Sequence, residues 1–259
     1  MPFVINNQSC NQNLYLHCGA FAVDRDALNR VQTPAETDTF KPISHRQLLE
    51  GVVSSVEDIG WKLVAEAHAL NDACDKYFGL LQVKPLHQEE DRDHGFGIGL
   101  RNANNKRMAA GLTFGSVVFV CDNMAFSGTV TVFRKHTKNL HGDLPERVRK
   151  AVESLPNISN AINQRFIDYR QTEIPDGKAH DIIIRALDAG VIGTNQIPVV
   201  LKEWRTPRHP EFADGGKTAW RLFNAFTESF KETSIWNNAS RGLVFQDLFD
   251  RESGLFLNN

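Results

Sequence analysis

Long apolar runs, cysteines and low-complexity tracts are all scarce in this chain of 259 residues. The longest wholly apolar run is five residues, VVFVC at 117–121, and it is far too short to cross a bilayer as a helix. Four cysteines are too few for a disulfide-stapled scaffold. The N-terminal sequence MPFVINNQSC has neither a basic stretch nor an apolar stretch, so we expect no secretory signal. These absences predict a soluble cytoplasmic protein with an ordinary apolar core.

The overall net charge of −2 conceals a strongly basic segment. Residues 101–150 hold nine Lys or Arg against three acids, a net charge of +6, which leaves −8 for the rest of the chain. A basic segment in an otherwise acidic protein is typical of polyanion binding. The alternative interpretation is an ordinary solvated surface.

The hydrophobic pattern between residues 44 and 134 predicts a helix followed by strands. Ser44 and Gln47 have capping-box spacing at the start of a helix whose buried stripe runs from Leu48 to Val56. Strands are expected at 76–83, 94–101, 109–121 and 128–134, whereas 61–70 is ambiguous between helix and strand. Short connectors favour antiparallel neighbours, so we expect an antiparallel sheet of four to five strands.

The second half of the chain is predicted to be mostly helical. A long helix is expected over 143–169, capped by Gly142 or Asp143, with Pro145 in its first turn and a kink or break at Pro156. Further helices are expected over 178–189, 217–232 and 240–251. The aromatic residues from 204 to 249 recur at helical spacing, which favours a core over a stacking surface.

These patterns together predict an α+β fold, with the sheet packed by the long helix. We expect an N-terminal arm and loop over 1–43, an α+β core over 44–174, and a helical C-terminal part over 175–259 packed on the core. The turn-rich segment 171–178 marks the expected boundary.

Polar and basic side chains within the basic segment are candidates for contacts with nucleic acid. The asparagine-rich turn could bind phosphates or base edges, or its asparagines could simply build a tight turn that needs positive φ. Three cations on the expected first turns of the long helix would oppose its dipole unless an anion is bound nearby. The candidate residues are Arg101, Asn104, Asn105, Lys106, Arg107, Arg134, Lys135, Lys138, Arg147, Arg149 and Lys150.

A glycine-rich strand is a further candidate for close contact with another molecule. Gly95, Gly97 and Gly99 share one face of the expected strand 94–101, which leaves that face without side chains. Such a face lets a nucleic-acid backbone or another chain approach closely. The alternative is a flat or bulged strand beneath a covering loop.

Features that suggest catalysis or metal binding all have simpler interpretations. Cys121 has no base at a fixed spacing and is expected to be a buried structural cysteine. The acidic stretch 89–94 is typical of a solvated loop, and Asp181 beside His180 is expected to cap a helix. We therefore expect no catalytic residue, no metal ion and no cofactor, and an enzyme is the least favoured class.

Three motifs, in order along the chain, resemble those of a known family. They are the turn RNANNKR at 101–107, the segment VFVCDNMAFSG at 118–128 and the stretch TAWRLFNAFTE at 218–228. The chain resembles the phage- and plasmid-encoded proteins that share domain of unknown function 932. NANNK stands here where the family more often has NSHDK, which argues against catalysis by this turn. The resemblance implies a mobile element and a bacterial cytoplasm.

Two functional hypotheses follow from the pattern. In the first, the protein binds nucleic acid, with single-stranded DNA favoured, through a basic groove in recombination, replication or DNA protection. The order of strands and long helix is similar to that of phage single-strand annealing proteins, which implies possible oligomers. In the second, a non-enzymatic interaction protein inhibits a host defence system through a host protein partner. Neither hypothesis involves a membrane.

Overall fold

The computed structural model describes residues 20–87, 94–118, 123–125, 131–213, 215–230 and 235–254. The chain divides into two compact units. The first comprises residues up to 115 together with 129–156, and the second comprises 116–128 together with 157–259. The boundary expected near residue 174 therefore lies inside the second unit. Each unit is described below by itself.

An antiparallel sheet forms the framework of the first unit. Its strands are β1 (Ala20–Val23), β2 (Trp61–Asn71), β3 (Lys76–Pro85), β4 (His94–Ala103), β5 (Ala110–Val118) and β7 (Thr131–Arg134), and β1 to β5 follow one another across the sheet. The first residues of β5 pair with β7. Its last residues, Ser116–Val118, belong to the second unit and pair there with β6 (Asn123–Ala125).

The α+β class is confirmed, whereas the expected number of strands is too small. The structure forms a seven-stranded sheet. The additional strands, β1 and β6, are four and three residues long, which is too short for an alternating pattern to show in the sequence. Strand β7 lies within the strand expected at 128–134. The ambiguous stretch 61–70 is strand β2, because it pairs along its length with β3 and at its end with β1.

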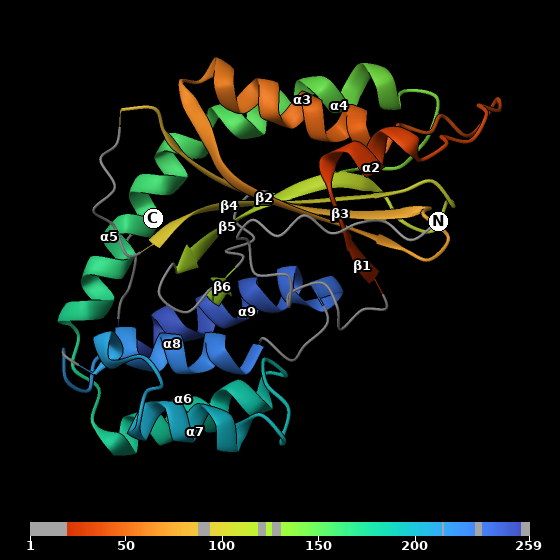
Figure 1. The fold of residues 1–259 in the computed structure, drawn as a ribbon. Helices are drawn as coiled ribbons and strands as arrows, with labels where there is room; N and C mark the ends of the chain where they lie inside the picture. The colour runs from red at the N-terminus through yellow and green to blue at the C-terminus, as the bar shows by residue number, and fades with distance from the viewer. Residues whose placement is uncertain are drawn as a thin grey trace. The chain divides into compact units, whose positions relative to one another are not determined.

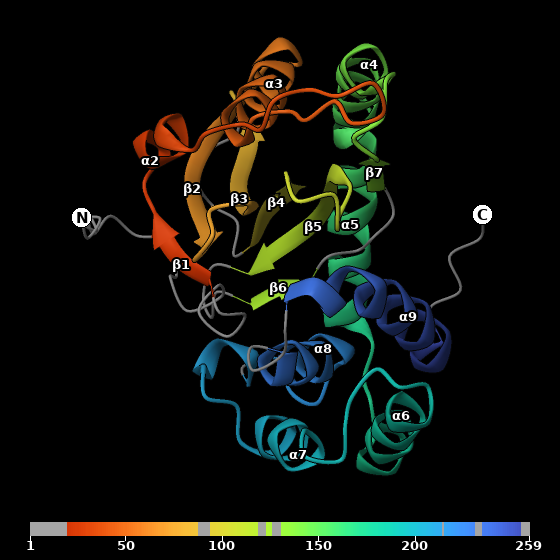
Figure 2. The ribbon, with the colours of Figure 1, turned by 90° about the vertical axis from the view of Figure 1, so that its right-hand side faces the viewer.

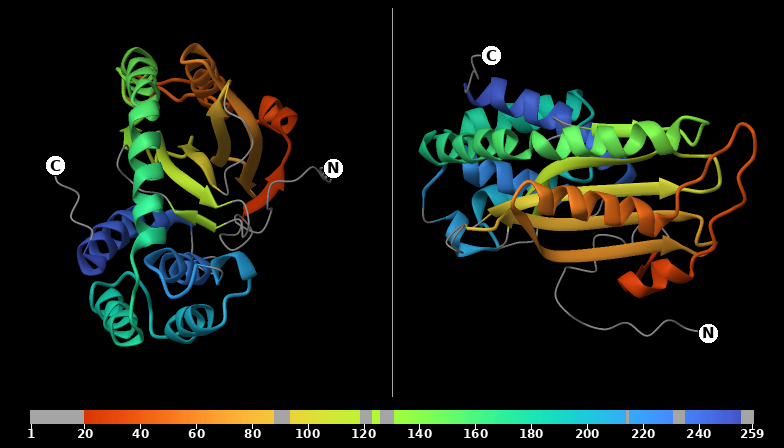
Figure 3. Two further views of the ribbon diagram at one scale, coloured as in Figure 1. Left: turned by 90° about the vertical axis from the view of Figure 1, so that its left-hand side faces the viewer. Right: turned by 90° about the horizontal axis from the view of Figure 1, so that it is seen from above.

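Helices α3 (His45–Asp58) and α4 (Leu140–Glu153) lie side by side on one face of this sheet (Figures 1 and 3). The predicted capping box of α3 is present. The Ser44 hydroxyl accepts a hydrogen bond from the Gln47 N–H at 3.0 Å, and the Gln47 side chain accepts one from the Ser44 N–H at 3.2 Å. The apolar stripe of α3, with Leu48, Leu49 and Val52, is buried as its spacing predicts.

Two expectations about helix positions in the first unit are wrong. The expected N-terminal arm and loop over 1–43 contains α2 (Arg25–Arg30), whose N-cap Asp24 accepts a hydrogen bond from the Ala27 N–H at 2.7 Å. Helix α4 begins at Leu140, so Pro145 lies inside the helix and outside its first turn. Burial of Leu140 explains the earlier start, because its side chain is completely shielded from solvent.

The segment 31–44, here called the strap, joins α2 to α3. In Figure 2 it leaves α2, runs across to α4 and returns to α3. A turn at its centre is closed by the Thr37 N–H, which donates to the Phe40 carbonyl at 2.9 Å. The Lys41 N–H then donates to the His136 carbonyl at 3.0 Å, which ties the strap to the residues that follow β7.

The second unit is built mainly from helices packed around aromatic side chains. They are α5 (Leu155–Gln171), α6 (Asp176–Asp188), α7 (Ile197–Arg205), η1 (Pro210–Phe212), α8 (Ala219–Phe230) and α9 (Ile235–Ser253). The break predicted at Pro156 is confirmed, since α4 ends at Glu153 and α5 begins at Leu155. Helix α7 was not predicted, because its pattern of nine residues is too short to stand out.

The aromatic residues of the second unit form its core, as their spacing predicts. Phe223 packs against Phe166, Tyr169, Trp220 and Phe249, with ring centroids 5.3–6.0 Å apart. Nearly all of the aromatic side chains described between 204 and 249 are buried. None of the helices in the described residues has the length and apolar character needed to span a bilayer.

Candidate nucleic-acid interface

Four exposed cations extend from one end of the sheet of the first unit: Lys106, Arg107, Lys135 and Lys138. We call them the basic sheet end. The first residue of β5, Ala110, pairs with the last residue of β7, Arg134. The turn between β4 and β5 and the residues after β7 therefore leave the sheet at the same end.

The ring of Phe40, in the strap, contacts Lys106 of the basic sheet end and His136, the residue that follows Lys135. The Lys106 ammonium lies 5.0 Å from the ring centroid, and the His136 ring centroid lies 5.6 Å from it. Phe40 is itself only 6% exposed, so the strap is packed firmly between the two segments. This shared contact brings cations about 30 residues apart in sequence into one region of the surface.

The charges of the basic sheet end are not matched by carboxylates in the described part of the chain. Nearby acids have other partners. Glu36 pairs with Lys41 at 2.7 Å and with His141 at 3.3 Å, and its hydrogen bond from Lys41 lowers its pKa. Asp75 accepts hydrogen bonds from the side chains of Asn71 and Asn105. The exposed ammonium and guanidinium groups therefore remain available to an anion.

The asparagines of the turn build structure and are poorly placed to contact a ligand. The Asn105 side chain donates to Asp75 at 3.0 Å and accepts from the Arg107 N–H at 3.1 Å. Asn104 is buried, and its N–H donates to the Asp75 carbonyl at 2.8 Å. Positive φ was expected at an asparagine, but it occurs at Lys106, with φ 67°. The hydrogen bonds of its neighbours fix the turn that imposes this conformation.

Two predicted arginines are engaged within the protein. Arg134 forms an ion pair with Asp143 of α4, which offsets its charge. The Arg101 guanidinium lies over the ring of Phe133, 3.8 Å from its centroid, and burial lowers the pKa of Arg101. Neither arginine belongs to the basic sheet end.

The cations of α4 do not oppose the helix dipole as expected. Because α4 begins at Leu140, Arg147, Arg149 and Lys150 lie in its C-terminal half, where cations are favoured. Arg149 pairs with Glu146 at 2.8 Å, and Lys150 pairs with the same carboxylate at 3.3 Å. These bonds lower the pKa of Glu146, and this part of α4 is an ordinary solvated helix face.

Arg147 is the exception among the cations of α4. Its side chain is exposed, and no acid among the described residues forms an ion pair with it. The side of the helix that carries Leu144, Val148 and Val152 is buried. The available cations therefore lie at the end of the sheet and on the outside of α4, whereas the sequence suggested a basic groove between sheet and helix.

A buried polar network, missed in the sequence, holds the strap and the sheet together. The Asn102 side chain donates to the Ile43 carbonyl at 2.8 Å and lies 3.0 Å from Nδ1 of His45. Nε2 of His45 lies 3.2 Å from the Cys74 carbonyl, so the neutral ring donates there and accepts from Asn102. Burial lowers the pKa of His45 to about 4. The sequence does contain one sign of this network: Asn102 is a polar residue on the same face of its strand as the apolar Leu100 and Ile98.

Several other candidate features lie outside the described residues, and one is reassigned. The acidic stretch 89–93, Cys121 and Asp122 are not described, and neither are the surroundings of His94 and Gly95. Gly97 and Gly99 of β4 pair with Gln82 and Leu80. Asp181 was expected to cap a helix, but it lies inside α6 and pairs with Arg185 at 2.8 Å.

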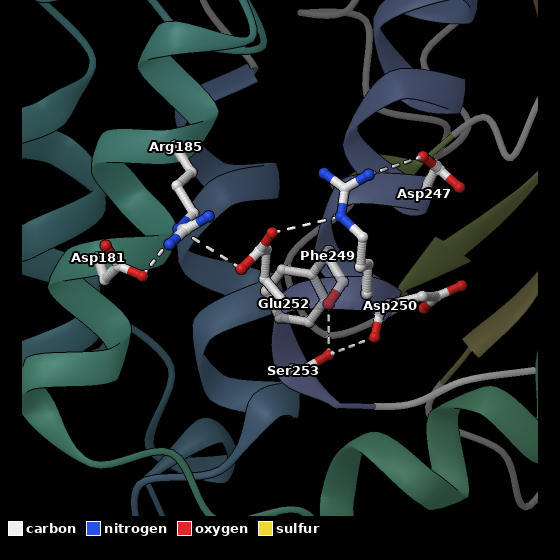
Figure 4. Close-up of polar contacts among 8 residues, drawn as sticks. Asp181, Arg185, Asp247, Phe249, Asp250, Glu252 and Ser253 are labelled. Carbon is white, nitrogen blue, oxygen red and sulfur yellow. Dashed lines mark hydrogen bonds and ion pairs between the residues drawn. The ribbon is translucent and has the colours of Figure 1, made fainter.

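Figure 4 shows a cluster of matched charges on α6 and α9 of the second unit. Arg185 of α6 also reaches Glu252 of α9 at 3.5 Å, and Arg251 contacts Glu252 at 3.3 Å. This cluster joins two helices through alternating charges, so its arginines already have carboxylate partners. The described residues contain no group of three or more His, Cys, Asp or Glu side chains arranged to hold a metal ion.

A comparison with known protein families matches residues 35–242 to a domain of unknown function, DUF932. The chain belongs to this family. The match covers most of the sequence and confirms the resemblance inferred from the three motifs. Among curated proteins and among solved structures, the comparisons found no match.

Two of the three DUF932 motifs have well-defined structural settings in this chain. The first forms the turn of the basic sheet end, and the third forms α8, where every residue from Ala219 to Ser229 is buried. In α8 the Asn224 side chain donates to the Trp220 carbonyl at 2.9 Å, and Glu228 pairs with Arg208 at 2.9 Å. The third motif therefore specifies packing within the second unit.

Proposed function

We propose that this DUF932 protein is a non-enzymatic, cytoplasmic nucleic-acid-binding protein of a phage or plasmid. It binds single-stranded DNA through the basic sheet end, with Arg147 as a further contact. The observation that carries the proposal is the contact of Phe40 with both Lys106 and His136, which places the two basic segments together. The protein serves recombination, replication or protection of the DNA of the mobile element, alone or as a homo-oligomer.

The physical basis of the proposed binding is neutralisation of phosphates. Exposed cations without carboxylate partners keep their charge available, and each phosphate contact releases condensed counterions. Cations already paired with acids, such as Arg149, gain much less from a phosphate because an existing ion pair must first be given up. The proposed interface is therefore smaller than the full set of basic residues in 101–150.

The test is fluorescence anisotropy with single-stranded and duplex oligonucleotides over a range of salt concentrations. We expect log affinity to fall linearly with log salt and single-stranded DNA to be preferred. Neutralising Lys106, Arg107, Lys135 and Lys138 to Gln should lower the slope by about 3, since each phosphate contact on a single strand contributes about 0.7. Arg134 is spared, because its ion pair with Asp143 would also be lost.

The matched control is a double variant with Arg149→Gln and Lys150→Gln. These substitutions remove paired cations from the same unit and should leave the salt slope nearly unchanged. Absence of binding by the wild-type protein at low salt would overturn the proposal and leave a host protein partner as the alternative. Equal losses in the quadruple variant and the control would also contradict it, because the effect would then reflect total charge.

A further inference from the structure

We propose that Phe133 and Arg101 form a stacking site for an unpaired nucleobase beside the basic sheet end. This inference rests on the proposed function and deepens it, because it names the residues that select single strands. Phe133 is 40% exposed and the Arg101 guanidinium lies 3.8 Å from its ring centroid. Exposed aromatic rings next to cations are the usual means by which proteins hold unpaired bases.

Strand alternation places both side chains on the same face of the sheet. Asn102 reaches Ile43 and His45 on the face covered by α3, so its neighbour Arg101 points to the opposite face. Arg134 reaches Asp143 on α4, so Phe133 likewise points away from the helices. The pair therefore lies on the face that α3 and α4 leave uncovered.

Gly111 of β5 makes room for the Phe133 ring. The two residues are paired across the strands, and a Cβ atom at position 111 would lie only 2.5 Å from Cδ1 of Phe133. The same atom would lie 1.9 Å from the Val132 carbonyl oxygen, so a side chain could not be accommodated by a shift of the ring alone. The glycine lets the ring lie close to the backbone of β5, where Arg101 of β4 can stack on it.

Arg101 lacks the partners that a half-buried guanidinium usually has. Its Nε atom is buried and has no hydrogen-bond partner, and none of the described carboxylates forms an ion pair with it. Burial without a counter-charge is costly, and a phosphate or the electron-rich edge of a base would offset that cost. The planar guanidinium can also stack on a base while it contacts the backbone of a nucleic acid.

The position of Phe133 favours single strands over duplexes. Phe133 precedes Lys135 by two residues, about 7 Å along an extended chain, so a strand whose phosphate contacts Lys135 can place a base at the ring. In a duplex both faces of each base are already stacked on neighbouring bases. Only an unpaired base can present a face to Phe133.

The experiment compares Phe133→Leu with the wild type on oligothymidylate and on an abasic oligonucleotide of equal length. Leucine keeps an apolar side chain but cannot stack, so affinity for oligothymidylate should fall at least about fivefold. Affinity for the abasic strand should not change. Phe133→Tyr retains the ring and should restore oligothymidylate binding to near the wild-type value, which distinguishes stacking from a merely structural effect.

A second measurement reports the stacked base directly. Emission of the indole introduced by Phe133→Trp, after subtraction of the wild-type signal, should be quenched by oligothymidylate and unaffected by the abasic strand. The proposed stacking site would be overturned if Phe133→Leu lowered the affinity for both oligonucleotides equally, or if neither quenched the emission of the Trp variant. Wild-type protein that binds neither ligand would overturn the proposed function as a whole, which is a separate result.

Discussion

The basic sheet end and helix α8 both carry motifs of the DUF932 family, but their polar groups have opposite surroundings. In α8 the charged and amide side chains are buried and have partners inside the protein, as Arg221 does through hydrogen bonds at 2.8 Å to the Trp204 and Arg205 carbonyls. In the basic sheet end, the cations are exposed and unmatched. One motif of the family can therefore specify packing while another forms an exposed surface. Whether the polar groups of a motif have partners inside the protein distinguishes the two cases.

The largest expected effect would come from the core around α8. Phe223→Ala removes a ring that packs against several other aromatic rings and should lower the free energy of unfolding by about 3–5 kcal/mol. Urea denaturation followed by circular dichroism measures this. Binding of DNA by the folded fraction should be unchanged, and a selective loss of binding would show that α8 does more than support the fold.

A second large effect concerns the buried network beneath the strap. The pKa of His45 is lowered from 6.5 to about 4, so the unfolded chain takes up a proton between these pH values and the folded protein does not. The contribution of neutral His45 to stability is therefore full above about pH 6.5. It falls as the pH drops and is lost by about pH 4, a change on the order of 3 kcal/mol.

Urea denaturation at neutral and acidic pH, repeated with His45→Gln, isolates this contribution. The variant should lose less stability on acidification than the wild type does. An identical pH dependence in the two proteins would show that other groups, such as the buried His136, account for the acid sensitivity. The stability of the protein would then not depend on the protonation of His45 beneath the strap.

An intermediate effect is expected from the double variant Lys135→Gln with Lys138→Gln. Two phosphate contacts would be lost, so the slope of log affinity against log salt should fall by about 1.4 for a single strand. Both side chains are exposed, so the midpoint of urea denaturation should stay at the wild-type value. A large loss of stability would place these lysines in the same class as the buried residues of α8.

The smallest effect is expected from Arg149→Gln. Its ion pairs with Glu146 and Glu153 are exposed on the surface of α4, where such pairs contribute little. Melting temperature and DNA affinity should both remain close to the wild-type values. Arg147→Gln, only two residues away, should weaken binding measurably, so equal results for the two arginines would remove the distinction between matched and unmatched cations.

The fold class and most elements could be predicted because local patterns determine them. The capping box at Ser44, the break at Pro156 and the aromatic spacing around Trp220 depend on near neighbours in the chain. The short strands β1 and β6 depend on pairing with β2 and β5, and the early start of α4 depends on burial of Leu140. Those are long-range interactions that no local window contains.

The candidate site shows the same division. The sequence by itself determined that residues 101–150 carry an excess of positive charge and that the chain has the motifs of the DUF932 family. Only the tertiary structure decided which cations remain available, because each charge is matched or left unmatched by residues brought near through folding. Asp143 pairs with Arg134, Glu146 pairs with Arg149, and Phe40 of the strap contacts the unmatched Lys106.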